Sequence, residues 1–152
     1  MPITCPISFE PLSTDEMREF DRPVMRCAFD VQNDLGRLCD EFIYKNSFRQ
    51  RLSQTGLDVI TEAPIELSFD RFATTLYVDA VVNHRVPYEL KAVRQLTPEH
   101  ETQLLIYMLL MKANRGKLIN FRPERVEARF VNASLTWEER HRFEIDKQNW
   151  TG

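Results

Sequence analysis

Residues 76–82 constrain the fold more than any other part of the sequence. They read LYVDAVV, which is apolar at odd and even positions alike apart from Asp79. This pattern is typical of a central β-strand whose two faces are both covered. A carboxylate in such a strand needs a partner, because an unpaired buried charge is costly. The segment therefore predicts a sheet covered on both sides, with a partner beside Asp79.

The sequence before this strand predicts two helices. Apolar residues at three- and four-residue spacing from Val24 onward, followed by Gly36 as a C-cap, predict the first. The second is expected over about residues 38–54, with Gly56 just past its end. The residues of this second helix expected to face the core are Leu38, Phe42 and Leu52.

The rest of the chain predicts a strand meander, a third helix and further strands. Residues 58–69, 74–82 and 87–93 are rich in strand-forming residues, with turns at 70–71 and 83–85. Thr97 followed by Pro98 predicts the start of a helix that ends near Gly116. Its apolar stripe consists of Leu104, Leu105, Met108, Leu109 and Met111. The last strand candidates are residues 117–121 and 126–131.

These segments predict one α/β domain with the order α-α-β-β-β-α-β-β. We place the domain at residues 23–132, because a chain of 152 residues fits a single core. Residues 1–22, which contain several prolines, are expected to form an extended arm. Residues 133–152 are expected to form a tail, with a possible short helix at 136–143.

Composition indicates a soluble cytoplasmic protein without membrane contact. No window approaches about 18 consecutive apolar residues, and the N-terminus lacks a basic region followed by an apolar run. The three cysteines show no Cys-x-x-Cys spacing, so reduced structural thiols are expected. The formal net charge of −3 gives no overall argument for a nucleic-acid partner.

The turn at residues 83–85 predicts a partner for Asp79. If those three residues form the loop, Val82 pairs with Val86, and counting back places Asp79 opposite Glu89. Their Cβ atoms would then lie roughly 5 Å apart on one face of the sheet. Lys91 lies two residues beyond Glu89, so strand alternation points it to the same face.

Two such acids and an amine suit a site for a hard divalent cation. Carboxylate oxygens favour Mg²⁺ or Mn²⁺ over zinc. A cation held there would polarise a phosphoryl oxygen and lower the pKa of its bound water, so the site suits phosphodiester hydrolysis. Lys91 would orient that water or neutralise developing charge. A second interpretation explains the same spacing. In it, Asp79, Glu89 and Lys91 form an ordinary cross-strand ion pair with one extra acid beside it.

Other polar residues are open to two interpretations. His100, Gln103 and Tyr107 share one helical face, which either lines a cleft or faces solvent. Glu41 and Tyr44 lie early in the second helix, where an acid commonly just complements the helix dipole. The basic residues that could follow a phosphate backbone, or simply form a solvated surface, are Arg85, Arg94, Lys112, Arg115 and Lys117.

Several short motifs, taken in order, resemble a known family. They are Leu35-Gly36, Glu41-x-x-Tyr44, Val78-Asp79, Glu89-Leu90-Lys91-Ala92 and His100-Glu101-x-Gln103-Leu104-Leu105-x-Tyr107. Their order and surroundings resemble the bacterial GxxExxY protein family, a branch of the PD-(D/E)XK nuclease superfamily. The resemblance covers roughly residues 24–131. One departure is Leu38, which stands where the family name calls for glycine, so the second helix is expected to start differently.

The resemblance implies a restriction-endonuclease-like core, which is a mixed sheet flanked by helices. It also implies a metal site with ligands at Asp79 and Glu89, the backbone carbonyl of Leu90 as a further ligand, and Glu41 as an acid that completes the site. Lys91 would be the catalytic lysine. Gln103 and Tyr107 resemble the Gln-x-x-x-Tyr element that lines the cleft in RecB-like members.

Two functions follow as hypotheses. The first is a Mg²⁺- or Mn²⁺-dependent nuclease that cuts phosphodiester bonds, with DNA as the expected substrate and a second copy or a protein partner supplying recognition. The second is a nuclease-fold accessory protein with little or no catalysis that binds nucleic acid or another protein. Fold analogy by itself does not decide between them.

Overall fold

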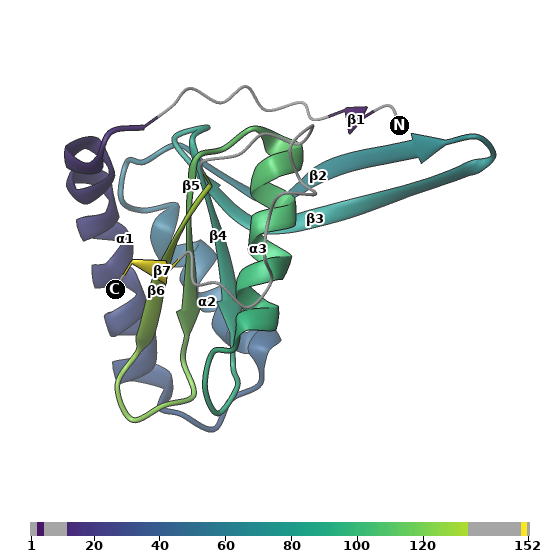
Figure 1. Cartoon of the computed structure of the whole chain (residues 1–152). Coiled ribbons are helices and arrows are strands. Elements are labelled where there is room, and N and C mark those ends of the chain that lie inside the picture. The colour runs from purple at the N-terminus through teal and green to yellow at the C-terminus, as the bar shows by residue number, and fades with distance from the viewer. Residues whose placement is uncertain (1–2, 5–11, 134–149, 152) are drawn as a thin grey trace.

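The protein is an α/β domain in which helices cover both faces of a mixed sheet (Figure 1). The computed structural model describes residues 3–4, 12–133 and 150–151. Helices α1 (Thr14–Leu35) and α2 (Glu41–Leu52) pack on one face, and α3 (Pro98–Met111) packs on the other. The strands are β1 (Ile3–Thr4), β2 (Val59–Phe69), β3 (Phe72–Val82), β4 (Val86–Lys91), β5 (Arg115–Asn120), β6 (Glu127–Asn132) and β7 (Trp150–Thr151).

The strands of the described residues lie in the sheet in their sequence order, β1 to β7. Strands β4 and β5 pair in parallel, with α3 as the crossover between them, while the other neighbours pair antiparallel. The predicted fold class and the order of the main elements are confirmed. The two-residue strands β1 and β7 were not predicted, because two residues carry no periodic signal.

Helix α1 begins much earlier than the sequence predicted. Ser13 is its N-cap and forms a capping box with Glu16, and the helix continues through Pro23. The prediction treated Pro23 as a boundary, because proline inside a helix removes a hydrogen bond. The extended arm is therefore wrong for residues 14–22. Most of residues 1–13 and the possible helix at 136–143 lie outside the described residues.

Helix α2 begins at Glu41, after Asp40, whose side chain accepts a hydrogen bond from the Ile43 N–H. Leu38 precedes the helix and is 92% exposed, and Phe42 is 71% exposed, so the prediction that both face the core is wrong. The later start sets a different buried face, spaced at four residues. That face consists of Tyr44, Phe48 and Leu52.

The turns and the third helix follow the sequence closely. Val82 pairs with Val86 around the loop at residues 83–85, as predicted. Thr97 is the N-cap of α3 with Pro98 at its first position, also as predicted. The helix ends sooner than expected, at Met111, and Gly116 lies inside β5. A Cβ atom at Gly116 would lie 2.8 Å from Met108 Sδ, so this glycine lets α3 approach the sheet closely.

A buried ionic network fastens α1 to the sheet. Asp21 accepts hydrogen bonds from the Tyr88 hydroxyl (2.8 Å) and from Lys117 Nζ (2.6 Å), and Lys117 lies 4.1 Å above the Phe130 ring centroid. Burial lowers the pKa of Lys117, while the charge of Asp21 acts in the opposite direction. Lys117, one of the predicted phosphate-following residues, is thus a structural cation.

Cys27 and Cys39 are free thiols, and Cys5 lies outside the described residues. Among the helices that the structure describes, none is long and apolar enough to cross a membrane.

Candidate active site

The β3–β4 ladder stops one pair before Asp79 and Glu89. Its pairs run from Val82 to Ala80, which faces Tyr88. Beyond this point side chains replace the backbone pairing. The Asp79 N–H donates to Glu89 Oε1 (3.1 Å), and the Leu90 N–H donates to Asp79 Oδ2 (2.8 Å). The structure thus brings the two acids together, as the loop count predicted.

Strand alternation also breaks at Asp79. Regular alternation would place Val78 on the same face as Ala80, which packs against α1 and α2. Instead Val78 joins Val81 in the cluster beneath α3. The outer part of the β2–β3 hairpin extends away from the domain (Figure 1). Asp79 therefore lies at a break in the alternation of β3, next to the point where the pairing of β3 with β4 ends.

The two acids are almost fully enclosed. Asp79 and Glu89 are each 5% exposed. Burial and the neighbouring charge of Asp79 raise the pKa of Glu89 to about 8, against the lowering effect of the Asp79 N–H and of Lys91 and Lys45. The pair therefore favours a shared proton or a bound cation, since either relieves the repulsion between two buried carboxylates.

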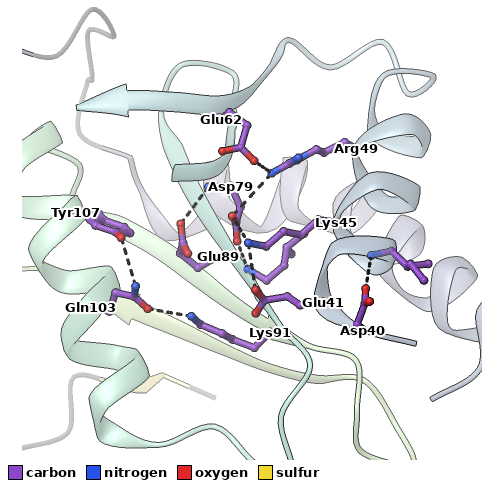
Figure 2. A network of polar contacts seen from close by, with 12 residues as sticks. Asp40, Glu41, Lys45, Arg49, Glu62, Asp79, Glu89, Lys91, Gln103 and Tyr107 are labelled. Carbon is purple, nitrogen blue, oxygen red and sulfur yellow. Dashed lines mark hydrogen bonds and ion pairs between the residues drawn. The ribbon is translucent and has the colours of Figure 1, made fainter. Parts of the chain in front are cut away.

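Lys91, Gln103 and Tyr107 form a hydrogen-bonded chain beside the acids (Figure 2). Lys91 Nζ donates to Gln103 Oε1 at 2.9 Å, and Gln103 Nε2 donates to the Tyr107 hydroxyl at 3.3 Å. Burial and then the charge of Glu89 raise the pKa of Tyr107. Gln103 and Tyr107 therefore reach Lys91 from α3, and the interpretation that they line a cleft stays a prediction. His100 instead caps its own helix, with Nδ1 accepting from the Thr97 N–H at 3.0 Å.

Helix α2 brings two further cations to Asp79 that the sequence interpretation missed. Lys45 Nζ lies 2.9 Å from Asp79 Oδ1 and 3.2 Å from Glu41 Oε2, so Glu41 reaches Asp79 only through this lysine. Arg49 Nη2 lies 3.8 Å from Asp79 Oδ1 and also pairs with Glu62 (Figure 2). A basic residue late in a helix also complements the helix dipole, so Lys45 and Arg49 did not stand out in the sequence. Their four-residue spacing from Glu41 was the signal that all three share a face.

The surroundings of Lys45 favour its charged form. Burial by itself would lower its pKa, but the hydrogen bond and charge of Asp79, with a further contribution from Glu41, raise the pKa overall. In the free protein Lys45 therefore neutralises the carboxylate that the sequence assigns to a metal.

The donor set around Asp79 and Glu89 fits a hard divalent cation. Two adjacent buried carboxylates supply oxygen ligands, and Mg²⁺ commonly uses one or two carboxylates together with water and substrate phosphate. Within the described ranges, three or more acidic, histidine or cysteine side chains do not gather closely enough to hold a metal by themselves. A third acid such as Glu41 would have to exchange its Lys45 contact to take part.

Other residues singled out from the sequence have structural roles. The buried Tyr44 hydroxyl donates to the Gly36 carbonyl (2.7 Å), and the Tyr44 ring stacks on Phe121 with centroids 4.8 Å apart. Arg85 pairs with Glu16, and Arg115 donates to the Leu12 carbonyl and to side chains near it. The structure therefore does not gather these residues around Asp79.

Comparisons with known proteins agree with this architecture. A family model described as the PD-(D/E)XK nuclease superfamily matches residues 18–131, which include every candidate site residue. A search of curated proteins finds no match. A solved structure titled "Crystal structure of SSO0001" is similar with a TM-score of 0.51 and 20% sequence identity. The similarity covers 78% of this chain and 60% of that chain, and at this identity it supports the fold alone.

Proposed function

The chain belongs to the PD-(D/E)XK nuclease superfamily, and we propose that it is a Mg²⁺- or Mn²⁺-dependent nuclease that hydrolyses phosphodiester bonds in DNA. The observation that supports the proposal is the pairing of the buried acids Asp79 and Glu89 where the β3–β4 ladder ends, with Lys91 near enough for its charge to act on the pKa of Glu89. Gln103 and Tyr107 extend this polar cluster along α3. Assignment to the GxxExxY branch stays a prediction.

Each residue has a distinct role in this proposal. Asp79, Glu89 and the Leu90 carbonyl hold the cation, with Glu41 as the further acid. The bound cation supplies a polarised phosphoryl oxygen and a water of lowered pKa. Lys91 orients the attacking water and offsets negative charge at the phosphate.

Gln103 and Tyr107 act on Lys91. Gln103 fixes the Lys91 ammonium through its amide oxygen, and the Tyr107 hydroxyl fixes the other end of that amide. Because a hydrogen-bonded chain limits the rotamers of a long lysine side chain, it keeps the ammonium aimed at the reacting centre.

Cleavage assays test the proposal directly. Single- and double-stranded DNA and RNA are incubated with Mg²⁺ or Mn²⁺, using wild type, Asp79→Asn and Lys91→Ala. The matched control is Arg51→Ala, which removes a basic side chain of α2 that pairs with Asp34 outside the site. We expect metal-dependent cleavage that both site variants lose and that the control keeps, with folding of each variant verified by circular dichroism. Cleavage that survives in Asp79→Asn contradicts the assigned centre.

The Lys45 contact favours one second function, a nuclease-fold accessory protein that binds nucleic acid or a partner. Lys45 already neutralises Asp79 at 2.9 Å, so the centre can be stable without a metal. The melting temperature distinguishes the two functions, because a cation bound only by the folded state must raise it. A melting temperature unchanged by millimolar Mg²⁺ and Mn²⁺, with no cleavage of any substrate, supports the accessory protein.

Partner and location follow from the same proposal. We also propose that a second copy or a protein partner contributes to substrate binding. The cytoplasm is the expected location, where DNA and reduced thiols occur together.

A further inference from the structure

Helix α2 presents two cations to one oxygen of Asp79. Lys45 Nζ lies 2.9 Å and Arg49 Nη2 3.8 Å from Asp79 Oδ1. The other oxygen, Oδ2, is already taken by the Leu90 N–H. The two basic side chains are 22% and 16% exposed, so both are mostly withdrawn from solvent. A single carboxylate oxygen thus has two mostly buried cations as neighbours.

Glu62 holds Arg49 in this position from the other side. In the β2–β3 register the flanking pairs are Thr61 with Ala80 and Ala63 with Val78, which places Glu62 opposite Asp79. The backbone of Glu62 is left-handed, with φ of 50°. A non-glycine residue in this conformation is strained, and such strain concentrates at functional sites. The strained backbone positions the Glu62 carboxylate that pairs with Arg49.

Arg49 has hydrogen-bond donors that its contacts with Glu62 and Asp79 do not use. A guanidinium has five N–H donors, and the contacts with Glu62 and Asp79 both involve Nη2. Its Nε is buried and has no hydrogen-bond partner among the described residues. Arg49 also borders an open hollow of about 550 Å³, whose lining includes Ser53, Asp58 and Thr61. An anion from solvent can therefore approach this side chain without crossing the core.

A divalent cation on the acids would change the partners of both α2 cations. It would take the Asp79 oxygen that Lys45 and Arg49 now share, and it would repel both of them at close range. Lys45 would keep Glu41 and Arg49 would keep Glu62, but each would lose Asp79. A phosphodiester beside the cation would offer a new acceptor, and the planar guanidinium fork matches phosphate oxygens.

We propose that Arg49, together with Lys45, is the phosphate-binding element of this centre, held on Asp79 and Glu62 until a nucleic-acid phosphate replaces Asp79 as its partner. The inference rests on the proposed function, because it deepens the account of the same site. It assigns recognition of the substrate backbone to α2, whereas the sequence pointed to basic residues elsewhere.

Binding of a fluorescein-labelled single-stranded oligonucleotide in EDTA tests this without catalysis. Asp79→Asn, which removes the competing charge, is the background in which Arg49→Gln and the control Arg51→Gln are compared. Arg51 lies on the same helix and pairs with Asp34, outside this cluster. We expect Asp79→Asn to bind more tightly than wild type in anisotropy titrations. Adding Arg49→Gln should weaken binding severalfold. It should also make the plot of log association constant against log salt concentration less steep by about 0.7, which is the value for one single-strand phosphate contact. Arg51→Gln should leave that slope unchanged.

The outcomes separate this inference from the proposed function. Equal effects of the Arg49 and Arg51 substitutions, or no oligonucleotide binding at low salt, overturn the phosphate site even if metal-dependent cleavage is found. Arg49-dependent binding with no cleavage leaves the phosphate site standing and removes the nuclease. If Arg49→Gln fails to fold, Arg49→Lys is compared with Arg51→Lys. The cation is retained, so the salt slope should persist while affinity falls severalfold only at position 49.

Discussion

Replacing Glu89 with glutamine tests the electrostatics of the site without any metal. Burial and the charge of Asp79 raise the pKa of Glu89 from 4.5 to about 8. Between these values the folded protein keeps a proton that the unfolded chain has lost, so the free energy of unfolding falls as the pH rises. The stabilising contribution is therefore complete below about pH 4.5 and lost by about pH 8.

The magnitude follows from about 1.4 kcal/mol for each pH unit. Between about pH 5 and pH 7.5, this group should remove about 3 kcal/mol from the free energy of unfolding of the wild type. The glutamine in Glu89→Gln cannot titrate, but its amide oxygen can still accept a hydrogen bond from the Asp79 N–H. The free energy of unfolding of this variant should therefore fall by about 3 kcal/mol less than that of the wild type over the same pH range. Urea unfolding in EDTA at constant ionic strength measures both proteins, and other titrating groups cancel in the difference. Parallel stability profiles would refute the reasoning.

Three further substitutions test the scaffold, each by urea unfolding. Lys117→Met should cost about 3–5 kcal/mol, because it leaves Asp21 buried without its cation; a loss below about 1 kcal/mol would contradict this. Gly116→Ala should cost about 1–3 kcal/mol, since the added Cβ would lie 2.8 Å from Met108 Sδ; unchanged stability would show that the helix shifts freely. Asp40→Ala should cost about 1 kcal/mol by removing the N-cap of α2, and Asp40→Asn should restore most of it.

The sequence predicted those parts of the molecule that local rules determine. The count across the loop at 83–85 works because a three-residue turn fixes the register, and Thr97-Pro98 marks a helix start by its own chemistry. The start of α1 was missed because the prolines up to Pro23 suggested an extended arm and the Ser13 capping box was not recognised. A cap and a buried apolar face together outweigh one lost hydrogen bond.

The contribution of α2 to the site could not be predicted in the same way. Which face of α2 is buried depends on where the helix starts, and the start at Glu41 turns Phe42 outward and Lys45 toward Asp79. The left-handed backbone of Glu62 has no local signal either, since neither glycine nor asparagine marks the position. Both features arise from packing between elements distant in sequence, which periodicity cannot report.

Because the β3–β4 ladder ends at the two acids, they have a structural role in addition to the proposed chemistry. Backbone N–H groups freed from a sheet must find another acceptor when they are buried. Here the Glu89 carboxylate accepts a hydrogen bond from the Asp79 N–H, and the Asp79 carboxylate accepts one from the Leu90 N–H. An alanine at either position leaves a buried donor unpaired, at a cost of about 1–3 kcal/mol, whereas asparagine or glutamine keeps an acceptor oxygen. Loss of cleavage in an alanine variant would therefore mix unfolding with chemistry. The same loss in an amide variant of unchanged stability would isolate the carboxylate charge, which is the property that a metal site requires.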